Sequence, residues 1–188
     1  MNKREDLIQA FNQFMTNYAQ DLMKSGDSQY QADEDWPSPC EYQREGQSCW
    51  QPVLQDEAGV TQPLSFKNVE EALDIQLDEQ FTTFFTLYFA NNLQAQHPLG
   101  ELELLQPWSE SDFSRLQQNL IGHLMMKQKL KQSPTLFFAL TDEEDLNLVV
   151  DNETGAVCLE YVGKPPHKTI AEDLAYFISQ CQPALFNE

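Results

Sequence analysis

The stretch WSESDFSRLQQNLIGHLMMKQKLKQSPTLFFAL, residues 108–140, predicts a long helix followed by a buried strand. Ser109 can cap the helix, with Asp112 three residues later in a variant of the capping box. Acids near the start and lysines near the end suit the helix dipole. Apolar residues recur at helical spacing, which predicts a buried row made of Phe113, Leu116, Leu120 and Leu124. Pro134 blocks further helix, so we expect the helix to span 109–131 and the strand to span 135–140.

Three further segments have helical periodicity. Residues 4–23 form an amphipathic pattern, with a core-facing stripe of Leu7, Phe11, Phe14, Tyr18 and Leu22. Residues 66–73 predict a short helix with Val69, Ala72 and Leu73 inward. Residues 169–180 predict a final helix, with Thr169 and Glu172 as a capping box and an inward row of Ile170, Leu174, Phe177 and Cys181.

Strand signals occur before and after the long helix. Leu102 and Leu104 alternate with Glu101 and Glu103, as in a half-buried strand over 101–106. Residues 146–150 and 157–162 flank an Asn-Glu-Thr-Gly turn at 152–155 and predict a hairpin.

The other segments are polar or mixed in pattern. Residues 48–53 predict a short strand that Pro52 ends or places at an edge, and residues 79–93 fit either a helix or a strand. Acidic, proline-containing segments at 25–47 and 55–63 predict loops. Together the elements predict one α+β domain over residues 1–188, with helices packed on a small, largely antiparallel sheet.

Charge is distributed very unevenly along the chain. The net charge is −19 over 188 residues. Residues 27–112 hold 17 acids against Arg44 and Lys67, a balance of −15, whereas residues 113–140 hold four bases and no acid. Self-repulsion of this size opposes a compact fold, and bases are normally interspersed with acids on a protein surface. We therefore expect a basic partner, attracted at long range and weakened by salt.

The same charge argues against two kinds of ligand. The phosphate groups of a nucleic acid would repel this negatively charged chain, so we expect no nucleic-acid binding. An anionic leaflet attracts polybasic segments, so membrane association should be indirect. We expect no secretory signal, because the beginning of the sequence is followed by no apolar core, and no membrane span, because the longest apolar patch is residues 81–90.

Chemical motifs are scarce. The sequence has no GxGxxG, GxxxxGK[ST], HExxH or GxSxG pattern. Its four cysteines fit no common zinc spacing and predict reduced cytosolic thiols. We read His123 as a structural histidine and the acidic run 142–145 as a solvated turn, since that run lacks the glycine and spacing of a calcium loop. We expect no catalytic residue, metal or cofactor.

Several runs together resemble the Syd family of bacterial SecY-interacting proteins. The most specific is Gln118-Asn-Leu-Ile-Gly-His-Leu124, within 108–124, followed by Pro134-Thr-Leu-Phe-Phe-Ala139. Shorter pieces agree in order and spacing along the chain: Ser38-Pro-Cys40, Trp50-Gln-Pro52, Val69-Glu70, Asp74-Ile75 and Gly155 to Cys158.

The resemblance implies an α+β protein of the SUKH superfamily without enzymatic activity or cofactor. It implies a cytoplasmic protein loosely peripheral on the inner membrane, held there by the basic cytosolic loops of the channel protein SecY, where it regulates or checks SecY assembly and protein translocation. Family-like runs and charge density together select the expected partner-binding residues, which are Glu70, Glu71, Asp74, Asp78, Glu101, Glu103, Glu110 and Asp112.

Two other classes of function stay open on the residues alone. The first is an immunity-type protein or nucleic-acid mimic that binds a soluble basic partner, since SUKH relatives include immunity proteins. The second is an enzyme that uses either Cys40 or Cys49 with a distant histidine such as His123, or a carboxylate site.

Overall fold

The computed structural model describes residues 2–185, and its main feature is a seven-stranded sheet in the order β10-β9-β8-β7-β6-β5-β11. All neighbouring strands in it are antiparallel. The strands are β5 (Leu93–His97), β6 (Gly100–Leu104), β7 (Thr135–Thr141), β8 (Leu146–Asp151), β9 (Val157–Tyr161), β10 (Lys168–Ala171) and β11 (Gln182–Pro183). Combined with the helices, this antiparallel sheet confirms the predicted α+β class.

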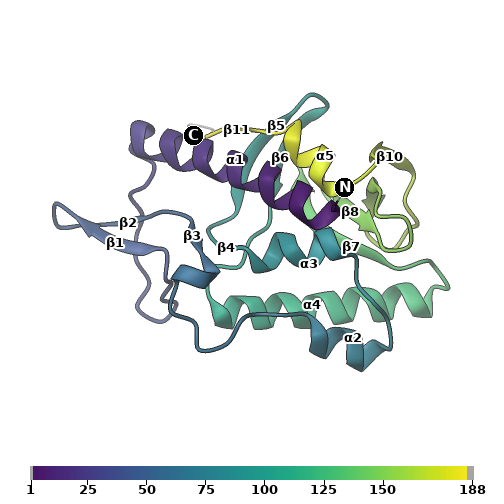
Figure 1. Ribbon diagram of the computed structural model, residues 1–188. Helices are drawn as coiled ribbons and strands as arrows, with labels where there is room; N and C mark the ends of the chain where they lie inside the picture. Colours follow the sequence, from purple (N-terminus) through teal and green to yellow (C-terminus); the bar gives the residue numbers. More distant parts are fainter. Residues whose placement is uncertain (1, 186–188) are drawn as a thin grey trace.

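Five α-helices accompany the sheet within the described part of the chain. They are α1 (Lys3–Ser25), α2 (Lys67–Leu73), α3 (Glu79–Thr86), α4 (Glu110–Lys129) and α5 (Leu174–Ser179). Figure 1 shows α1, α3 and α4 one below the other, with β5 and β6 passing behind α1. Helix α1 contacts α3, α5 and β11, whereas α4 contacts β7 and α2.

Two short antiparallel ladders form outside the main sheet. Strands β1 (Glu41–Arg44) and β2 (Gln47–Trp50) make a hairpin that projects beyond the helices in Figure 1. Strand β3 (Val53–Leu54) pairs with β4 (Tyr88–Phe89), and a 3-10 turn, η1 (Gln55–Glu57), follows β3. The prediction of a loop over 25–47 is therefore wrong for its last part, where positive φ angles at Glu45 and Gly46 close a tight turn.

The long helices agree with the sequence pattern. All five residues of the expected stripe on α1 are buried. Helix α4 begins after Ser109, whose Oγ accepts the Asp112 N–H at 3.2 Å, and Leu116 alone of its predicted row is only partly buried. The predicted hairpin of β8 and β9 is also confirmed.

Two local expectations are wrong. Thr169 lies in β10, and the final helix begins later with Asp173 as its N-cap, whose Oδ1 accepts the Tyr176 N–H at 2.8 Å. Ala72 on α2 is exposed.

The ambiguous segment 79–93 contains both kinds of structure. It forms α3, then β4, and ends at the first residue of β5. Its phenylalanines explain the ambiguity, since they pack inward from a helix as well as they would from a strand. The ring centroid of Phe84 lies 4.8 Å from that of Phe11 on α1 and 5.8 Å from that of Phe138 on β7. It lies 4.9 Å from that of Phe85, its neighbour on α3.

Strand alternation gives the sheet two different faces next to β6. Leu102 and Leu104 are buried in the core, so Glu101 and Glu103 point to the other side. Antiparallel register places Glu103 opposite Gln94 and Glu101 opposite Gln96, and on the next strand Glu103 faces Leu140. A polar and acidic sheet face therefore lies behind the helical core.

Candidate functional site

Four of the eight predicted partner-binding acids lie on α2 or between α2 and α3. Glu70 Oε1 accepts the Leu77 N–H at 2.9 Å, and Asp78 Oδ1 caps α3 by accepting the Phe81 N–H at 2.9 Å. Glu71 and Asp74 are exposed, and Asp74 has a positive φ of 50° where it ends α2. Glu70 and Asp78 thus stabilise the local backbone whether or not they meet a partner.

The two predicted acids on α4 differ from each other. Glu110 is exposed in the first turn. Asp112 is partly buried, and its Oδ2 accepts the Trp108 N–H at 2.8 Å. Its Oδ1 lies 2.6 Å from Nη2 of Arg115, which is 62% exposed. The guanidinium of Arg115 also lies over Trp36, 5.1 Å from the ring centroid.

Glu101 and Glu103 lie together on the polar face of β6. Glu101 is exposed, and Glu103 is partly buried. Glu103 Oε1 accepts a hydrogen bond from Asn92 Nδ2 at 2.7 Å. These two carboxylates share one strand face, whereas the acids on α2 form a separate group.

Three adjoining hollows connect Glu101, Glu103 and Asp112, and we call this surface the acidic tract. The first hollow, about 290 Å³, shares Asn91 and Asn92 with the second, about 450 Å³. The second shares Gln94 and Glu103 with the third, about 210 Å³. Seven carboxylates line the tract: Asp27, Asp33, Glu41, Glu101, Glu103, Asp112 and Asp142. Arg115 is the one lysine or arginine that lines it among the described residues.

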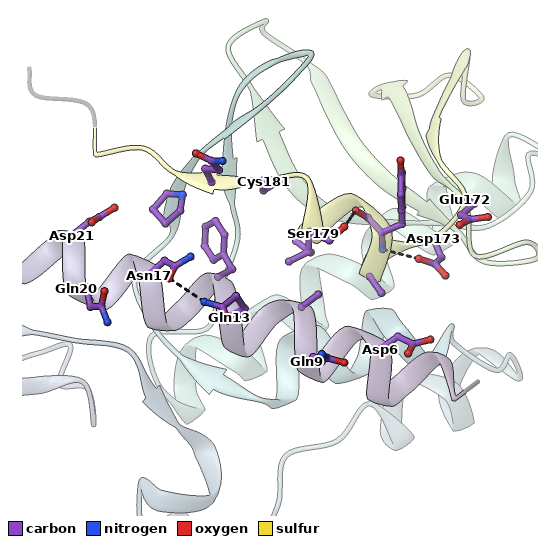
Figure 2. A pocket seen from close by; sticks show the side chains of 17 residues that line it. Asp6, Gln9, Gln13, Asn17, Gln20, Asp21, Glu172, Asp173, Ser179 and Cys181 are labelled. Atoms are coloured by element: carbon purple, nitrogen blue, oxygen red, sulfur yellow. Dashed lines mark hydrogen bonds between the residues drawn. The ribbon is translucent and has the colours of Figure 1, made fainter.

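A separate groove of about 830 Å³ runs between α1 and α5 (Figure 2). Asp6 and Asp21 lie toward opposite ends of its α1 wall, and Glu172 and Asp173 lie at the beginning of α5. Three glutamines and Asn17 lie on the α1 wall between the acids, beside Ala10 and Phe14. Gln13 Nε2 donates to Asn17 Oδ1 at 3.1 Å. The groove shares no lining residue with the acidic tract, and it contains none of the predicted site residues.

His123 belongs to a buried polar cluster under the second half of α4. Its Nε2 lies 3.1 Å from Thr135 Oγ1, and Thr135 donates to Glu160 Oε1 at 2.9 Å. Lys127, which is fully buried, places Nζ 2.8 Å from Glu160 Oε2. Burial and the nearby ammonium of Lys127 lower the pKa of His123 to about 4, so the imidazole is neutral at physiological pH. These contacts agree with the structural reading of His123.

The cysteines are free and buried. Burial raises the pKa of both Cys40 and Cys181 to about 12, which leaves those thiols protonated. Within residues 2–185, no group of three or more His, Cys, Asp or Glu side chains could hold a metal ion. No helix in the same span is long and apolar enough to cross a membrane.

Sequence reasoning missed four carboxylates of the tract, namely Asp27, Asp33, Glu41 and Asp142. Asp33 lies in the segment 25–47, whose pattern predicts a loop, and Asp142 lies in the acidic run 142–145, whose pattern predicts a solvated turn. The turn reading is consistent with the exposure of residues 142–145, but Asp142 also lines the third hollow. The signal available was the −15 balance of residues 27–112, which marks the region without selecting individual residues.

The fold and the tract together define a strongly acidic α+β protein with a hollowed surface that is lined by carboxylates. The family model described as Syd protein (SUKH-2) matches residues 8–183. The chain therefore belongs to the Syd family.

Relatives over most of the chain have the same family name. "Protein Syd" from Alteromonas mediterranea is 52% identical over 154 residues, which are 80% of this chain and 82% of the relative. "Protein Syd" from Pseudoalteromonas atlantica is 43% identical over 185 residues, covering 95% of this chain and 93% of the relative. That from Colwellia psychrerythraea is 44% identical over 182 residues, covering 93% and 91%.

Proposed function

We propose that this chain is a non-enzymatic protein that binds the basic cytosolic loops of SecY through the acidic tract. The observation that carries the proposal is the tract itself, where seven carboxylates and one arginine line three connected hollows. Membership of the Syd family supports the choice of partner, because the resemblance to this family implies SecY as the partner.

Charge complementarity supports the same partner. Cytoplasmic loops of membrane proteins carry an excess of lysine and arginine, which an acidic surface attracts and orients. The net charge of −19 opposes direct contact with anionic lipid. Attachment to the cytoplasmic side of the inner membrane would then depend on SecY and be loose and peripheral. A role in checking or regulating SecY assembly and translocation fits reversible binding of this kind.

The proposal assigns Glu101, Glu103 and Asp112 to the interface among the residues expected from sequence, because these three line the tract. The other acids expected from sequence lie outside the tract, so the proposal does not include them: Glu70, Glu71, Asp74, Asp78 and Glu110. Asp112 and Glu103 are already hydrogen-bonded within the protein, so they are held in place before a partner arrives.

The test is co-sedimentation with SecY-containing and SecY-depleted inverted membrane vesicles across a salt series. Raising salt from about 0.01 M to about 1 M shortens the Debye length from about 30 Å to about 3 Å. We expect binding that requires SecY and decreases across this range. Equal binding to both vesicles, or capture by a soluble basic protein in place of SecY, would contradict the proposed partner.

A pair of double variants tests the surface. Glu101→Gln with Glu103→Gln removes two tract charges and should weaken SecY binding about three- to tenfold, because exposed charge pairs contribute less than about 1 kcal/mol each. The matched control, Asp6→Asn with Glu172→Gln, removes two charges from the α1–α5 groove and should change affinity much less. If the control weakens binding and the tract variant does not, the groove is the interface and the tract assignment is wrong.

A further inference from the structure

The first hollow of the acidic tract has three aromatic side chains in its lining, against two in the second hollow and none in the third. It lies where the segment 30–41 meets the start of α4, and three rings line it: Tyr30, Trp36 and Trp108. Three carboxylates share this hollow of about 290 Å³, those of Asp33, Glu41 and Asp112. Aromatic faces beside carboxylates are the surroundings that bind organic cations.

The hollow is held in shape by contacts between distant parts of the chain. Trp108 Nε1 donates to the Trp36 carbonyl at 3.2 Å, and Ser38 Oγ donates to the Trp108 carbonyl at 2.6 Å. The Tyr30 and Trp108 rings meet edge to face, with centroids 5.8 Å apart. A ligand would therefore meet rings and acids that are already positioned, which lowers the entropic cost of binding.

Arg115 shows that this lining accommodates a guanidinium. Its Cζ lies 5.1 Å from the centroid of the Trp36 ring, and its Nη2 lies 2.6 Å from Asp112 Oδ1. The side chain of Arg115 is 62% exposed, so it lies at the rim. One ring and one carboxylate of the hollow thus already contact a cation of the chain itself.

The side chain of Gln106 has an amide oxygen without a hydrogen-bond donor within residues 2–185. It lines the same hollow and is only 5% exposed. Its Nε2 donates to the carbonyls of Phe84, at 3.3 Å, and Leu105, at 2.9 Å. Its Oε1 has no hydrogen-bond partner among the described residues. Buried amide oxygens are nearly always hydrogen-bonded, so this oxygen is suited to accept a donor from a ligand.

We infer that the first hollow is a subsite for an arginine side chain of the basic partner segment. The guanidinium would lie against the aromatic rings, pair with the carboxylates and donate to Gln106 Oε1. Arginine suits the site better than lysine, because its planar fork both stacks on rings and donates several hydrogen bonds at once. The inference rests on the proposed function and narrows the partner chemistry to an exposed arginine.

The test uses the full chain and the capped pentapeptide acetyl-GSRSG-amide, with versions carrying lysine or citrulline in place of arginine. Binding is followed by NMR shifts of the tryptophan indole N–H groups and of the Gln106 side-chain amide, and the dissociation constant by titration. We expect the arginine peptide to bind at least about threefold more tightly than the lysine peptide, since guanidinium stacking adds to charge. The neutral citrulline peptide should not bind.

Three variants separate this subsite from general charge attraction. Trp36→Leu should weaken arginine-peptide binding about fivefold, as expected for loss of a cation–π contact, while near-UV circular dichroism checks that the fold persists. Arg115→Gln should tighten binding by freeing the ring and Asp112. Arg44→Gln, which makes the same charge change on the exposed hairpin, should tighten it much less.

Equal affinity for arginine and lysine peptides, together with no effect of Trp36→Leu, would overturn the subsite. If the protein binds vesicles in a SecY-dependent way but does not bind the arginine peptide, the subsite is overturned and the proposed function stands. Peptide binding with the expected selectivity, but without SecY-dependent vesicle binding, would support the subsite and contradict the proposed partner.

Discussion

Replacing Lys127 by methionine should strongly destabilise the fold, because its ammonium is fully buried and neutralises a buried carboxylate. Nζ lies 2.8 Å from Glu160 Oε2, and it donates to Gln132 Oε1 at 3.0 Å and to the Lys164 carbonyl at 2.9 Å. Glu160 is only 2% exposed. Removing one partner of a buried ion pair costs about 3–5 kcal/mol, because the other charge remains without compensation.

Removing both charges should restore much of that stability. Lys127→Met combined with Glu160→Leu leaves no buried charge, and Thr135 Oγ1 can turn its proton toward His123 Nε2, which is 3.1 Å away. We expect the double variant to lie within about 2 kcal/mol of the parent, since apolar replacements of whole buried pairs are often neutral. The control Lys129→Met, at an exposed position two residues further along α4, should change stability by less than about 0.5 kcal/mol.

Urea unfolding, followed by tryptophan fluorescence and far-UV circular dichroism, measures these differences if the slope m is unchanged. A loss below about 1 kcal/mol for Lys127→Met would refute the reasoning. So would a double variant less stable than the single one, because the penalty would then not come from the unpaired Glu160 carboxylate.

Two further predictions concern His123 and Asp78. The folded pKa of His123 is lowered from 6.5 to about 4, so the unfolded chain alone binds that proton between these pH values and stability is lost as pH falls through this window. The free energy of unfolding should fall by about 3 kcal/mol by the acid end of this pH window. His123→Gln should flatten this part of the stability–pH curve, whereas the control His167→Gln, at an exposed site, should not. An unchanged slope for His123→Gln would contradict the argument that burial lowers the pKa of His123. Asp78→Ala should cost about 1 kcal/mol by removing the α3 N-cap while leaving SecY-vesicle affinity unchanged; a loss of affinity at unaltered stability would return Asp78 to the interface.

Sequence patterns predicted the long elements well, because their signals are local. Helix α4 combines a capping serine, dipole-compatible charges and an apolar row, and all of these act within a few turns. The final helix shows where local signals mislead. Thr169 and Glu172 have the spacing of a capping box, but Thr169 pairs with Cys158 in the sheet, and strand pairing decides the conformation there.

For the segments that resemble the Syd family, the sequence predicted local structure but not which distant residues they contact. His123 contacts Thr135 and lies near Glu160, and these partners come from separate strands that no spacing rule connects. Gly155 has a positive φ of 80°, and a Cβ there would lie 3.3 Å from Asp78 Oδ2. Its place in a turn was predictable, but its proximity to the α3 cap was not.

By itself, the sequence determined the α+β class, the main helices, the β8–β9 hairpin and the acidity of residues 27–112, because periodicity and composition are properties of neighbouring residues. Tertiary structure alone decided which acids share a surface. Glu70 and Asp78 hold backbone N–H groups, whereas Asp33, Glu103 and Asp142 line one tract although they are far apart in the chain. The reason is physical: a charge attracts a partner through its position in space, and packing of the sheet and loops sets that position.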